Sequence, residues 1–212
     1  MLKAFTLATV FGGSVAASLT LLPTRAAAET LPELISKDES VNEVVIQEVA
    51  PEKPKETRLV CKSCNVNETI VLDRLQDHGL KDPKAIATIM GNIRQESTFI
   101  PEICEGGART GYHRCRRGGF GLIQWTSVNR FLGLGKYARK INGDPSSIHT
   151  QLSYLLEEGD WKMIETHMFE PGKTINDYMR LAHKWIRWGH HGSRTAYAYD
   201  YLKRFATAET EA

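Results

Sequence analysis

The helical spacing of apolar residues between residues 67 and 205, broken once by a glycine-rich stretch, constrains the fold more than any other feature. Asp82-Pro83 opens one helix, because Asp is a favoured N-cap residue and Pro fits the first helical position. The expected helices begin near Asn67, Pro83, Ser127, Pro145, Thr174 and Ser193. Residues 98–123 lose the helical period and gather six glycines, which indicates loops or short antiparallel hairpins. We therefore predict an α+β fold, mostly α, with a small Gly-rich insert.

The first 28 residues have the pattern of an export signal. Lys3 is positively charged, residues 4–22 carry no charge, and Ala26-Ala27-Ala28 is a small-residue cleavage pattern. The alternative is an uncleaved anchor, because residues 4–22 are just long enough to span a bilayer. We expect a cleaved signal peptide at 1–28, a secreted or periplasmic protein, and no stable membrane insertion of the cleaved chain.

Charge divides the rest of the chain into two parts. Residues 29–57 hold eight acidic and three basic residues with little apolar surface to bury, which predicts a flexible acidic tether. Residues 58–212 hold 17 acidic and 22 basic residues. A basic domain suits an anionic partner, and composition alone allows either nucleic acid or a bacterial wall polymer. We expect the folded domain to cover 58–206, with a disordered tail at 207–212.

The chain has four cysteines, Cys61, Cys64, Cys104 and Cys115. An even number of cysteines in an exported protein favours disulfides. Their connectivity stays open, because the first pair could be bridged to the second pair or each pair could form a local bridge. A zinc site is an alternative, since Cys-x-x-Cys is followed by His113-x-Cys115. Export favours oxidised cysteines, so we predict two disulfides and no metal.

Glu96 is the candidate catalytic residue. It lies seven residues after Ile89 and three after Ile93, so helical spacing places it on the buried face of its helix, near the C-terminus. Burial and the negative end of the helix dipole both disfavour a carboxylate, so the pKa of Glu96 should be raised. A carboxylic acid that stays protonated near neutral pH can protonate a glycosidic oxygen. The alternative is a glutamate that turns to solvent where the helix frays.

Two segments carry a resemblance to a known superfamily. Residues 91–101 read GNIRQESTFIP, and residues 118–126 read GGFGLIQWT. A helix that ends in Glu-Ser, an aromatic residue and a proline soon after, and a later Gly-Leu-x-Gln segment resemble the lysozyme-like superfamily of goose-type lysozymes and lytic transglycosylases. In that superfamily the Gly-Leu-x-Gln segment lines the cleft.

The Gln-Trp-Thr ending, the Arg130 that follows and residues 151–155 (QLSYL) look closest to the phage tail lysozyme family, and the resemblance covers roughly residues 66–205. It implies that Glu96 is the catalytic acid of a peptidoglycan hydrolase that cleaves β-1,4 glycosidic bonds. Export and a basic domain agree with that substrate and agree poorly with nucleic acid. We expect peptidoglycan glycan strands as the partner, no nucleic acid, no cofactor and a monomer.

A second carboxylate would decide the mechanism. An inverting glycosidase needs a base that activates water, with its two carboxyl groups about 6.5–9.5 Å apart. Glu102 and Glu105 follow Glu96 in a loop that should face the cleft, and a spacing like that from Glu96 to Glu105 resembles some phage lysozymes. Both could instead be surface acids. A lytic transglycosylase would then be the better interpretation, because a substrate hydroxyl attacks in place of water and one acid/base residue suffices.

Three residues are candidate substrate-binding groups. The amide of Gln124 can exchange hydrogen bonds with a sugar acetamido group, and Trp125 offers a flat apolar face for a sugar ring. Tyr112 lies in the glycine-rich loop, where it could touch substrate. Each could instead serve the fold, Gln124 at a hairpin end and Trp125 in the core. For the whole protein, the alternative from another class is a non-catalytic cell-wall-binding module that kept the fold.

Overall fold

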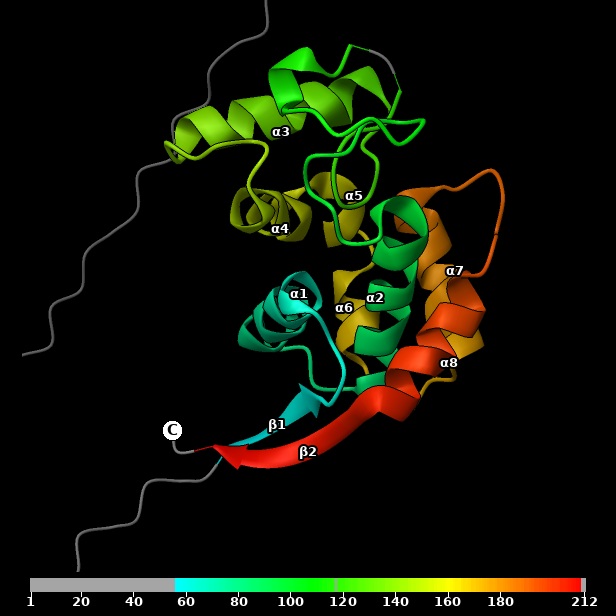
Figure 1. The fold of residues 1–212 in the computed structure, drawn as a ribbon. Coiled ribbons are helices and arrows are strands. Elements are labelled where there is room, and N and C mark those ends of the chain that lie inside the picture. Colours follow the sequence, from blue (N-terminus) through cyan, green and yellow to red (C-terminus); the bar gives the residue numbers. More distant parts are fainter. Residues whose placement is uncertain (1–55, 117, 211–212) are drawn as a thin grey trace, which may run out of the picture. The chain divides into compact units, whose positions relative to one another are not determined.

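The computed structural model describes residues 56–116 and 118–210, so the predicted signal peptide and all but the last two residues of the predicted tether lie outside the described residues. Within them the chain forms eight α-helices, one short 3-10 helix and two strands (Figure 1). In chain order these are β1 (Glu56–Cys61), α1 (Val66–Asp77), α2 (Pro83–Ser97), η1 (Tyr112–Arg114), α3 (Val128–Lys140), α4 (Ile148–Glu157), α5 (Gly159–Lys162), α6 (Glu165–Phe169), α7 (Ile175–Ile186), α8 (Arg194–Arg204) and β2 (Phe205–Thr210).

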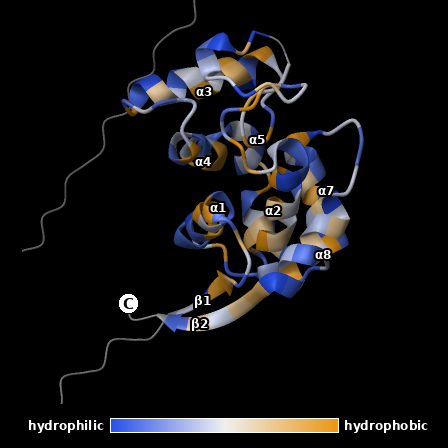
Figure 2. Cartoon of the chain, in the orientation of Figure 1, coloured by the Kyte–Doolittle hydropathy of each residue, from blue (hydrophilic) through white to orange (hydrophobic). Residues whose placement is uncertain are grey.

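Helix α2 is the centre of the helical core and contacts α1, α7 and α8 (Figure 1). Its apolar residues Ile86, Ile89 and Ile93 have no solvent exposure. Figure 2 shows the same pattern in α1, where hydrophilic residues lie on the outer side and apolar residues lie toward α2. The apolar stripe therefore packs inward, as the helical spacing predicted.

Gly91 allows α2 and α8 to approach each other closely. A Cβ atom at position 91 would lie 2.7 Å from the backbone nitrogen of Ala198 and 2.8 Å from the carbonyl oxygen of Arg194. Contacts that short with backbone atoms cannot be relieved by a side-chain movement, so glycine is required here. The close approach brings the end of α2, which carries Glu96, beside the start of α8.

Strands β1 and β2 join the two ends of the described chain. They pair antiparallel, with Glu56 opposite Thr210 and Cys61 opposite Phe205. This corrects the predicted boundaries at both ends, because the domain reaches back to residue 56 and forward to residue 210. The predicted disordered tail is wrong for residues 207–210, since strand pairing orders them. A pairing between segments so far apart leaves no local signal in the sequence.

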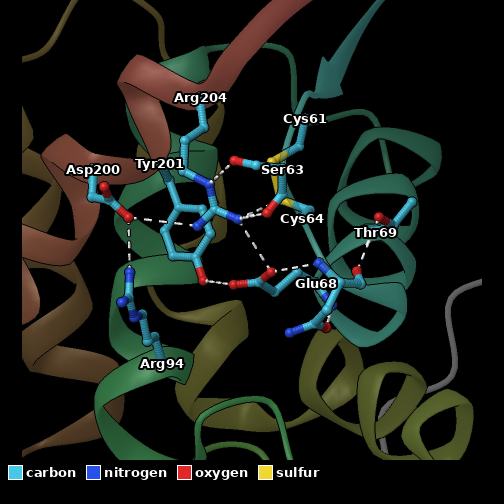
Figure 3. A network of polar contacts seen from close by, with 10 residues as sticks. Cys61, Ser63, Cys64, Glu68, Thr69, Arg94, Asp200, Tyr201 and Arg204 are labelled. Carbon is cyan, nitrogen blue, oxygen red and sulfur yellow. Dashed lines mark hydrogen bonds and ion pairs between the residues drawn. A yellow bond between two sulfur atoms is a disulfide. The ribbon is translucent and has the colours of Figure 1, made fainter.

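A polar network fastens the end of α8 to the β1–α1 connection (Figure 3). The Arg204 guanidinium donates to the carbonyl oxygen of Ser63 and, over 3.2 Å, to Oε2 of Glu68. The Tyr201 hydroxyl donates to Oε1 of the same carboxylate. Glu68 also accepts from the backbone N–H of Asn65 and so completes the capping box of α1. This carboxylate thus ties the C-terminal helix to the N-terminal end of the domain.

The helix starts follow the predicted capping residues with one shift. Asp82 accepts hydrogen bonds from the backbone N–H groups of the first turn of α2, and Thr174 and Asp177 form the capping box of α7. Helix α4 begins at Ile148 rather than near Pro145, because a turn with a hydrogen bond from Ser147 N–H to the Asp144 carbonyl precedes it. The short helices α5 and α6 were not predicted.

The stretch between α2 and α3, described except for residue 117, is irregular. It contains η1 and two isolated antiparallel bridges, Ile103 with Arg109 and Cys104 with Phe120. Disulfides join Cys61 to Cys64 and Cys104 to Cys115. The cysteines are therefore bridged locally, which is one of the three connectivities left open by the sequence, and no free thiolate remains among them to bind zinc.

The described residues have the predicted α+β, mostly α fold, with a single two-stranded sheet. Among them, no helix combines the length and the apolar character needed to cross a lipid bilayer.

Candidate active site

Glu96 is the next-to-last residue of α2, and its side chain is only 14% exposed. The helix ends at the next residue, Ser97, because Thr98 and Phe99 both adopt left-handed backbone conformations with φ of 51° and 62°. The chain therefore turns away sharply, and the Glu96 carboxyl group is left at the edge of the core, facing a cleft. The half-buried position agrees with the prediction from helical spacing.

Three segments that carried the family resemblance meet beside the end of α2. The Ser97 hydroxyl donates to the Leu122 carbonyl over 2.8 Å. The Leu122 N–H donates to Oε1 of the fully buried Gln151 over 2.9 Å, and Nε2 of Gln151 donates to the Pro101 carbonyl over 2.8 Å. These hydrogen bonds hold the 121–124 segment against the helix end, which fixes the wall of the cleft near Glu96.

Two adjoining cavities form one elongated cleft with Glu96 in its middle. One has a volume of about 540 Å³ and extends from Glu96 to α8 and the loop before it. The other has a volume of about 400 Å³ and extends from Glu96 to the loop at residues 103–107. Glu96, Gln124 and Thr126 line both cavities, so the two adjoin at these residues. An elongated cleft with a central acid suits a polymer that is cut within its chain.

Arg194, the first residue of α8, is the partner of Glu96. Its Nη2 forms an ion pair with Oε1 of Glu96. Its Nη1 donates to the carbonyl oxygens of His190 and His191 over 2.8 and 2.7 Å, and the guanidinium lies 4.7 Å from the centre of the Trp188 ring. Since its side chain is only 5% exposed, the arginine is fixed in place before any ligand arrives.

Sequence reasoning did not find Arg194, which lies 98 residues from Glu96. One signal was present. Arg194 directly follows the predicted N-cap residue Ser193, and a cation in the first turn of a helix is opposed by the helix dipole. A positive charge in an unfavourable place indicates a partner elsewhere in the fold, and here that partner is a carboxylate.

Burial is the main cause of the raised pKa of Glu96, which lies above its ordinary value of 4.5. The charge and hydrogen bond of Arg194 act in the opposite direction, and so does the more distant charge of Arg130. The raised pKa agrees with the sequence-based expectation. The two arginines therefore limit the rise in the pKa of Glu96.

A buried carboxylate, Glu158, places Arg130 in the cleft. Glu158 accepts hydrogen bonds from the indole N–H groups of Trp125 and Trp185, over 3.1 and 2.8 Å. It also accepts two from the Arg130 guanidinium, over 2.9 and 2.6 Å. Paired donors in a fixed fork hold the guanidinium in one orientation. Arg130, whose position carried part of the resemblance, therefore adds a fixed positive charge to the cleft wall.

Two further carboxylates line the cleft. Glu105 lines the same cavity as Glu96 on the side of the 103–107 loop, is exposed, and accepts a hydrogen bond from the Gly119 N–H over 3.1 Å. Asp160, which sequence reasoning missed, lines the other cavity and is held by Arg187 at 2.6 Å and by Arg130 at 3.4 Å. Glu102 is exposed and lines neither cavity. The structure thus brings Glu105, and not Glu102, to the cleft with Glu96.

Gln124 lies in the cleft wall between the two cavities. Its backbone is left-handed, with φ of 51°, and its Nε2 donates to the carbonyl oxygens of Ile103 and Gly121 over 3.2 and 3.0 Å. The amide nitrogen is therefore already used within the protein. The amide oxygen has no hydrogen-bond partner among the described residues, so it is the atom that Gln124 can offer to a sugar N–H or hydroxyl.

Trp125 and Tyr112 are placed in the core instead of the cleft. Trp125 has no solvent exposure and donates its N–H to Glu158, so it has no free face for a sugar ring. Tyr112 is 6% exposed, stacks on Phe131 with ring centres 4.4 Å apart, and donates its hydroxyl to the Phe131 carbonyl. These two predictions are corrected, because aromatic residues beside a glycine-rich loop supply the apolar support that the loop itself lacks.

Trp188 is the aromatic residue that lines the cleft. It is partly exposed and packs against the Arg194 guanidinium. Trp185, three residues earlier, lies in the core instead and has no solvent exposure. Helix α7 ends at Ile186, so Trp188 lies beyond the helix, where spacing no longer predicts its environment.

Within residues 56–116 and 118–210, no three histidine, cysteine, aspartate or glutamate side chains come together as a metal-binding group. The side chains that line the cleft carry carboxyl, guanidinium, amide, hydroxyl, imidazole and indole groups.

Comparison with known proteins identifies the family. Residues 66–205, more than half of the chain, match the phage tail lysozyme family. None of the curated proteins compared with this chain matches it. The matched residues include Glu96, Arg130, Arg194 and both cavities of the cleft. A central half-buried acid in an elongated cleft is the arrangement that a lysozyme-like, peptidoglycan-degrading enzyme requires, and the chain belongs to the phage tail lysozyme family.

Proposed function

We propose that the protein is an exported muramidase that hydrolyses the β-1,4 glycosidic bonds of peptidoglycan, with Glu96 as the general acid. The observation that carries this proposal is the position of Glu96, half-buried in the middle of an elongated cleft, with burial raising the pKa of its carboxyl group. A carboxyl group that keeps its proton near neutral pH can transfer it to the leaving glycosidic oxygen.

Arg194 has two effects on that proton transfer. Its ion pair fixes the orientation of the Glu96 carboxyl group through Oε1 and leaves Oε2 as the oxygen that can face the substrate. It also stabilises the carboxylate that remains after the proton has moved to the sugar oxygen. Because Arg194 is held by two backbone carbonyls and by Trp188, this stabilisation requires no rearrangement during the reaction.

Glu105 is the proposed base for water activation. It lines the same cavity as Glu96, and its exposed carboxylate is oriented by a single backbone N–H. Asp160 is less suited to the role, because Arg130 and Arg187 both hold it. Each of its two carboxylate oxygens is already in contact with a guanidinium group and is less available to a water molecule. An inverting mechanism follows, with a water molecule between Glu105 and the anomeric carbon.

A lytic transglycosylase is the second candidate. That reaction needs only one acid/base residue. Among the described residues, Glu96 is the only one with a carboxyl group that lines both cavities. A muramyl hydroxyl would attack in place of water and leave a 1,6-anhydro end. A non-catalytic wall-binding module is the candidate from another class, and it would need neither Glu96 nor its raised pKa.

The export signal at 1–28 supports action outside the cytoplasm, where peptidoglycan lies. The basic character of residues 58–212 supports binding to an anionic wall polymer. We propose that the protein acts as a monomer and that its partner is peptidoglycan rather than nucleic acid.

Digestion of purified peptidoglycan, followed by mass spectrometry of the products, tests the proposal. We expect products with reducing ends from the wild type, and none from Glu96→Gln at equal amounts of folded protein. Products with 1,6-anhydro ends would show instead that the protein is a lytic transglycosylase. Binding to the wall without any cleavage by the wild type would establish the non-catalytic alternative.

A further inference from the structure

A second groove adjoins the catalytic cleft at Trp188. This residue lines the cleft that contains Glu96, and it also lines a groove of about 620 Å³ between α7 and the start of α8. The indole therefore separates two neighbouring spaces. A ligand that occupies the cleft has its closest route onto α7 past Trp188.

The groove is lined by cationic and imidazole side chains. Arg180, His183 and Lys184 come from α7, His191 comes from the loop before α8, and no acidic residue lines it. All four residues are exposed. Lys184 and His183 form no ion pair with any described residue, so their capacity to bind an anion is not used within the described domain. An array of this kind attracts carboxylate or phosphate groups.

Helix α7 holds the positive side chains on one of its faces. Arg180, His183 and Lys184 lie three and four residues apart and so share one face of α7, whereas Trp185 points into the core with no solvent exposure. Met179, which is 5% exposed, lies on the same side and gives the groove an apolar floor. The positive side chains are thus held by a helix whose packing does not depend on them.

Asp177, the nearest acidic residue, does not neutralise the positive charge of the groove. Asp177 accepts hydrogen bonds from the backbone N–H and the hydroxyl of Thr174, and it forms an ion pair with Arg180. It lines a further hollow on the other side of Arg180 and Lys184, together with Lys173. One acid that already caps a helix leaves the groove with a net positive charge.

We propose that this groove binds the carboxylate groups of the peptide stems that branch from a glycan strand seated in the cleft. The inference rests on the proposed function and adds to it, since it makes peptide-substituted strands the preferred substrate. The muramyl sugars of such a strand carry acidic peptides on their lactyl groups. A stem that leaves the strand beside Trp188 meets first an indole face and then Arg180 and Lys184, so apolar and charged contacts follow in order along the groove.

The test compares Arg180→Ala/Lys184→Ala with the wild type on two substrates, intact peptidoglycan strands and strands stripped of stems by an amidase. We expect KM on intact strands to rise roughly five- to ten-fold, because each exposed charge contributes up to about a factor of five. We expect unchanged kcat, and equal KM for both proteins on stripped strands. Lys136→Ala/Lys140→Ala is the matched control, since it removes the same charge from exposed positions of α3 that line neither the groove nor the cleft.

Direct binding gives a second readout that does not need turnover. Titration of the wild type with a muramyl peptide, and with the same peptide amidated at its carboxyl groups, should show weaker binding of the amidated form. The double variant should bind both forms equally. Equal loss of activity on intact and stripped strands, or no loss on either, would overturn the proposal. Tighter, charge-dependent binding of poly(glycerol phosphate) than of the muramyl peptide would overturn it in favour of a phosphate polymer. A wild type inactive on both substrates would instead reject the proposed function.

Discussion

Helix α8 supplies an arginine to a buried glutamate at each of its ends, and the two pairs behave in opposite ways. At its start, Arg194 pairs with Glu96 at the end of α2. At its last residue, Arg204 pairs with Glu68 in α1 (Figure 3). The exposed fractions of the two glutamate side chains are similar, 14% and 10%, although more protein surrounds Glu96 than Glu68. Nevertheless the pKa of Glu96 is raised and that of Glu68 is lowered.

Besides their depth of burial, the two carboxylates differ in the hydrogen bonds that each accepts. Burial acts to raise the pKa of Glu68, but the Tyr201 hydroxyl, the Asn65 backbone N–H and Arg204 together outweigh it. Glu96 accepts from Arg194 alone among the described residues. A carboxylate with several donors is held as an anion and serves the fold, whereas one with a single donor keeps its affinity for a proton. The deeper burial of Glu96 and its smaller number of donors therefore both distinguish it from Glu68.

Reciprocal glutamine substitutions give the largest expected effects. Glu96→Gln should lower the rate of peptidoglycan cleavage about 10²–10⁴-fold, because Gln cannot transfer the proton. Its free energy of unfolding should stay close to that of the wild type, because Gln can still accept from Arg194. Glu68→Gln should keep kcat at temperatures where it is folded. Cleavage rates and urea denaturation of both variants check this, and a Glu68 variant with a greater loss of kcat than the Glu96 variant would reverse the comparison.

Glu105→Gln should lower the cleavage rate by about two orders of magnitude, the effect expected for loss of a general base. Asp160→Asn is the matched control, because Asp160 also lines the cleft but is held by Arg187 and Arg130. Steady-state rates of both variants decide between them. If Glu105→Gln keeps near-normal activity, the inverting mechanism falls and single-acid chemistry by Glu96 takes its place.

Glu68→Gln should lower the free energy of unfolding by about 2–3 kcal/mol at pH 7, because a buried network loses its charged acceptor. The folded-state pKa of Glu68 lies below 4.5, so its stabilisation is complete above 4.5 and is lost as the pH falls through the folded-state value. The difference between wild type and variant should therefore shrink in acid. Denaturation curves at pH 7 and pH 3 measure it, and a difference that grows in acid would contradict the lowered pKa.

Arg194→Met should give the smallest effect that the comparison predicts, a shift in a pH profile. Arg194 opposes the rise in the pKa of Glu96, so its removal should raise that pKa further and move the basic limb of the pH–rate profile to higher pH. Arg194→Lys should move it less, because the charge remains. Arg204→Met should lower stability without moving the limb. A basic limb that stays fixed in Arg194→Met would show that the ion pair does not tune Glu96.

Local patterns predicted most of the helical fold. Capping residues and apolar spacing gave the starts of α2 and α7 and the half-buried place of Glu96, because these depend on neighbours within a few residues. The pairing of β1 with β2 and the pairing of Arg194 with Glu96 could not be predicted, since each joins segments that are far apart in sequence. Both follow from the packing of whole helices, and the close approach at Gly91 is one example.

Some of the residues that line the cleft were predicted from the sequence, and others were missed. Glu96, Glu105 and Gln124 do line the cleft. Trp125 lies in the core, where its indole N–H donates to the buried Glu158. The residue type alone does not reveal this polar contact. The tryptophan that lines the cleft is Trp188 and not Trp125. Trp188 is not buried by helix α7, because α7 ends two residues before it.

Carboxyl-carbon NMR of the two glutamates tests most directly the claim that the pKa of Glu96 is raised whereas that of Glu68 is lowered. Protein with ¹³C-labelled glutamate side chains would be titrated, with Glu96→Gln and Glu68→Gln used to assign the two signals. We expect the Glu96 carboxyl group to titrate above 4.5 and the Glu68 carboxyl group to titrate below it. A Glu96 signal that titrates at or below that of Glu68 would contradict the assignment of Glu96 as the general acid.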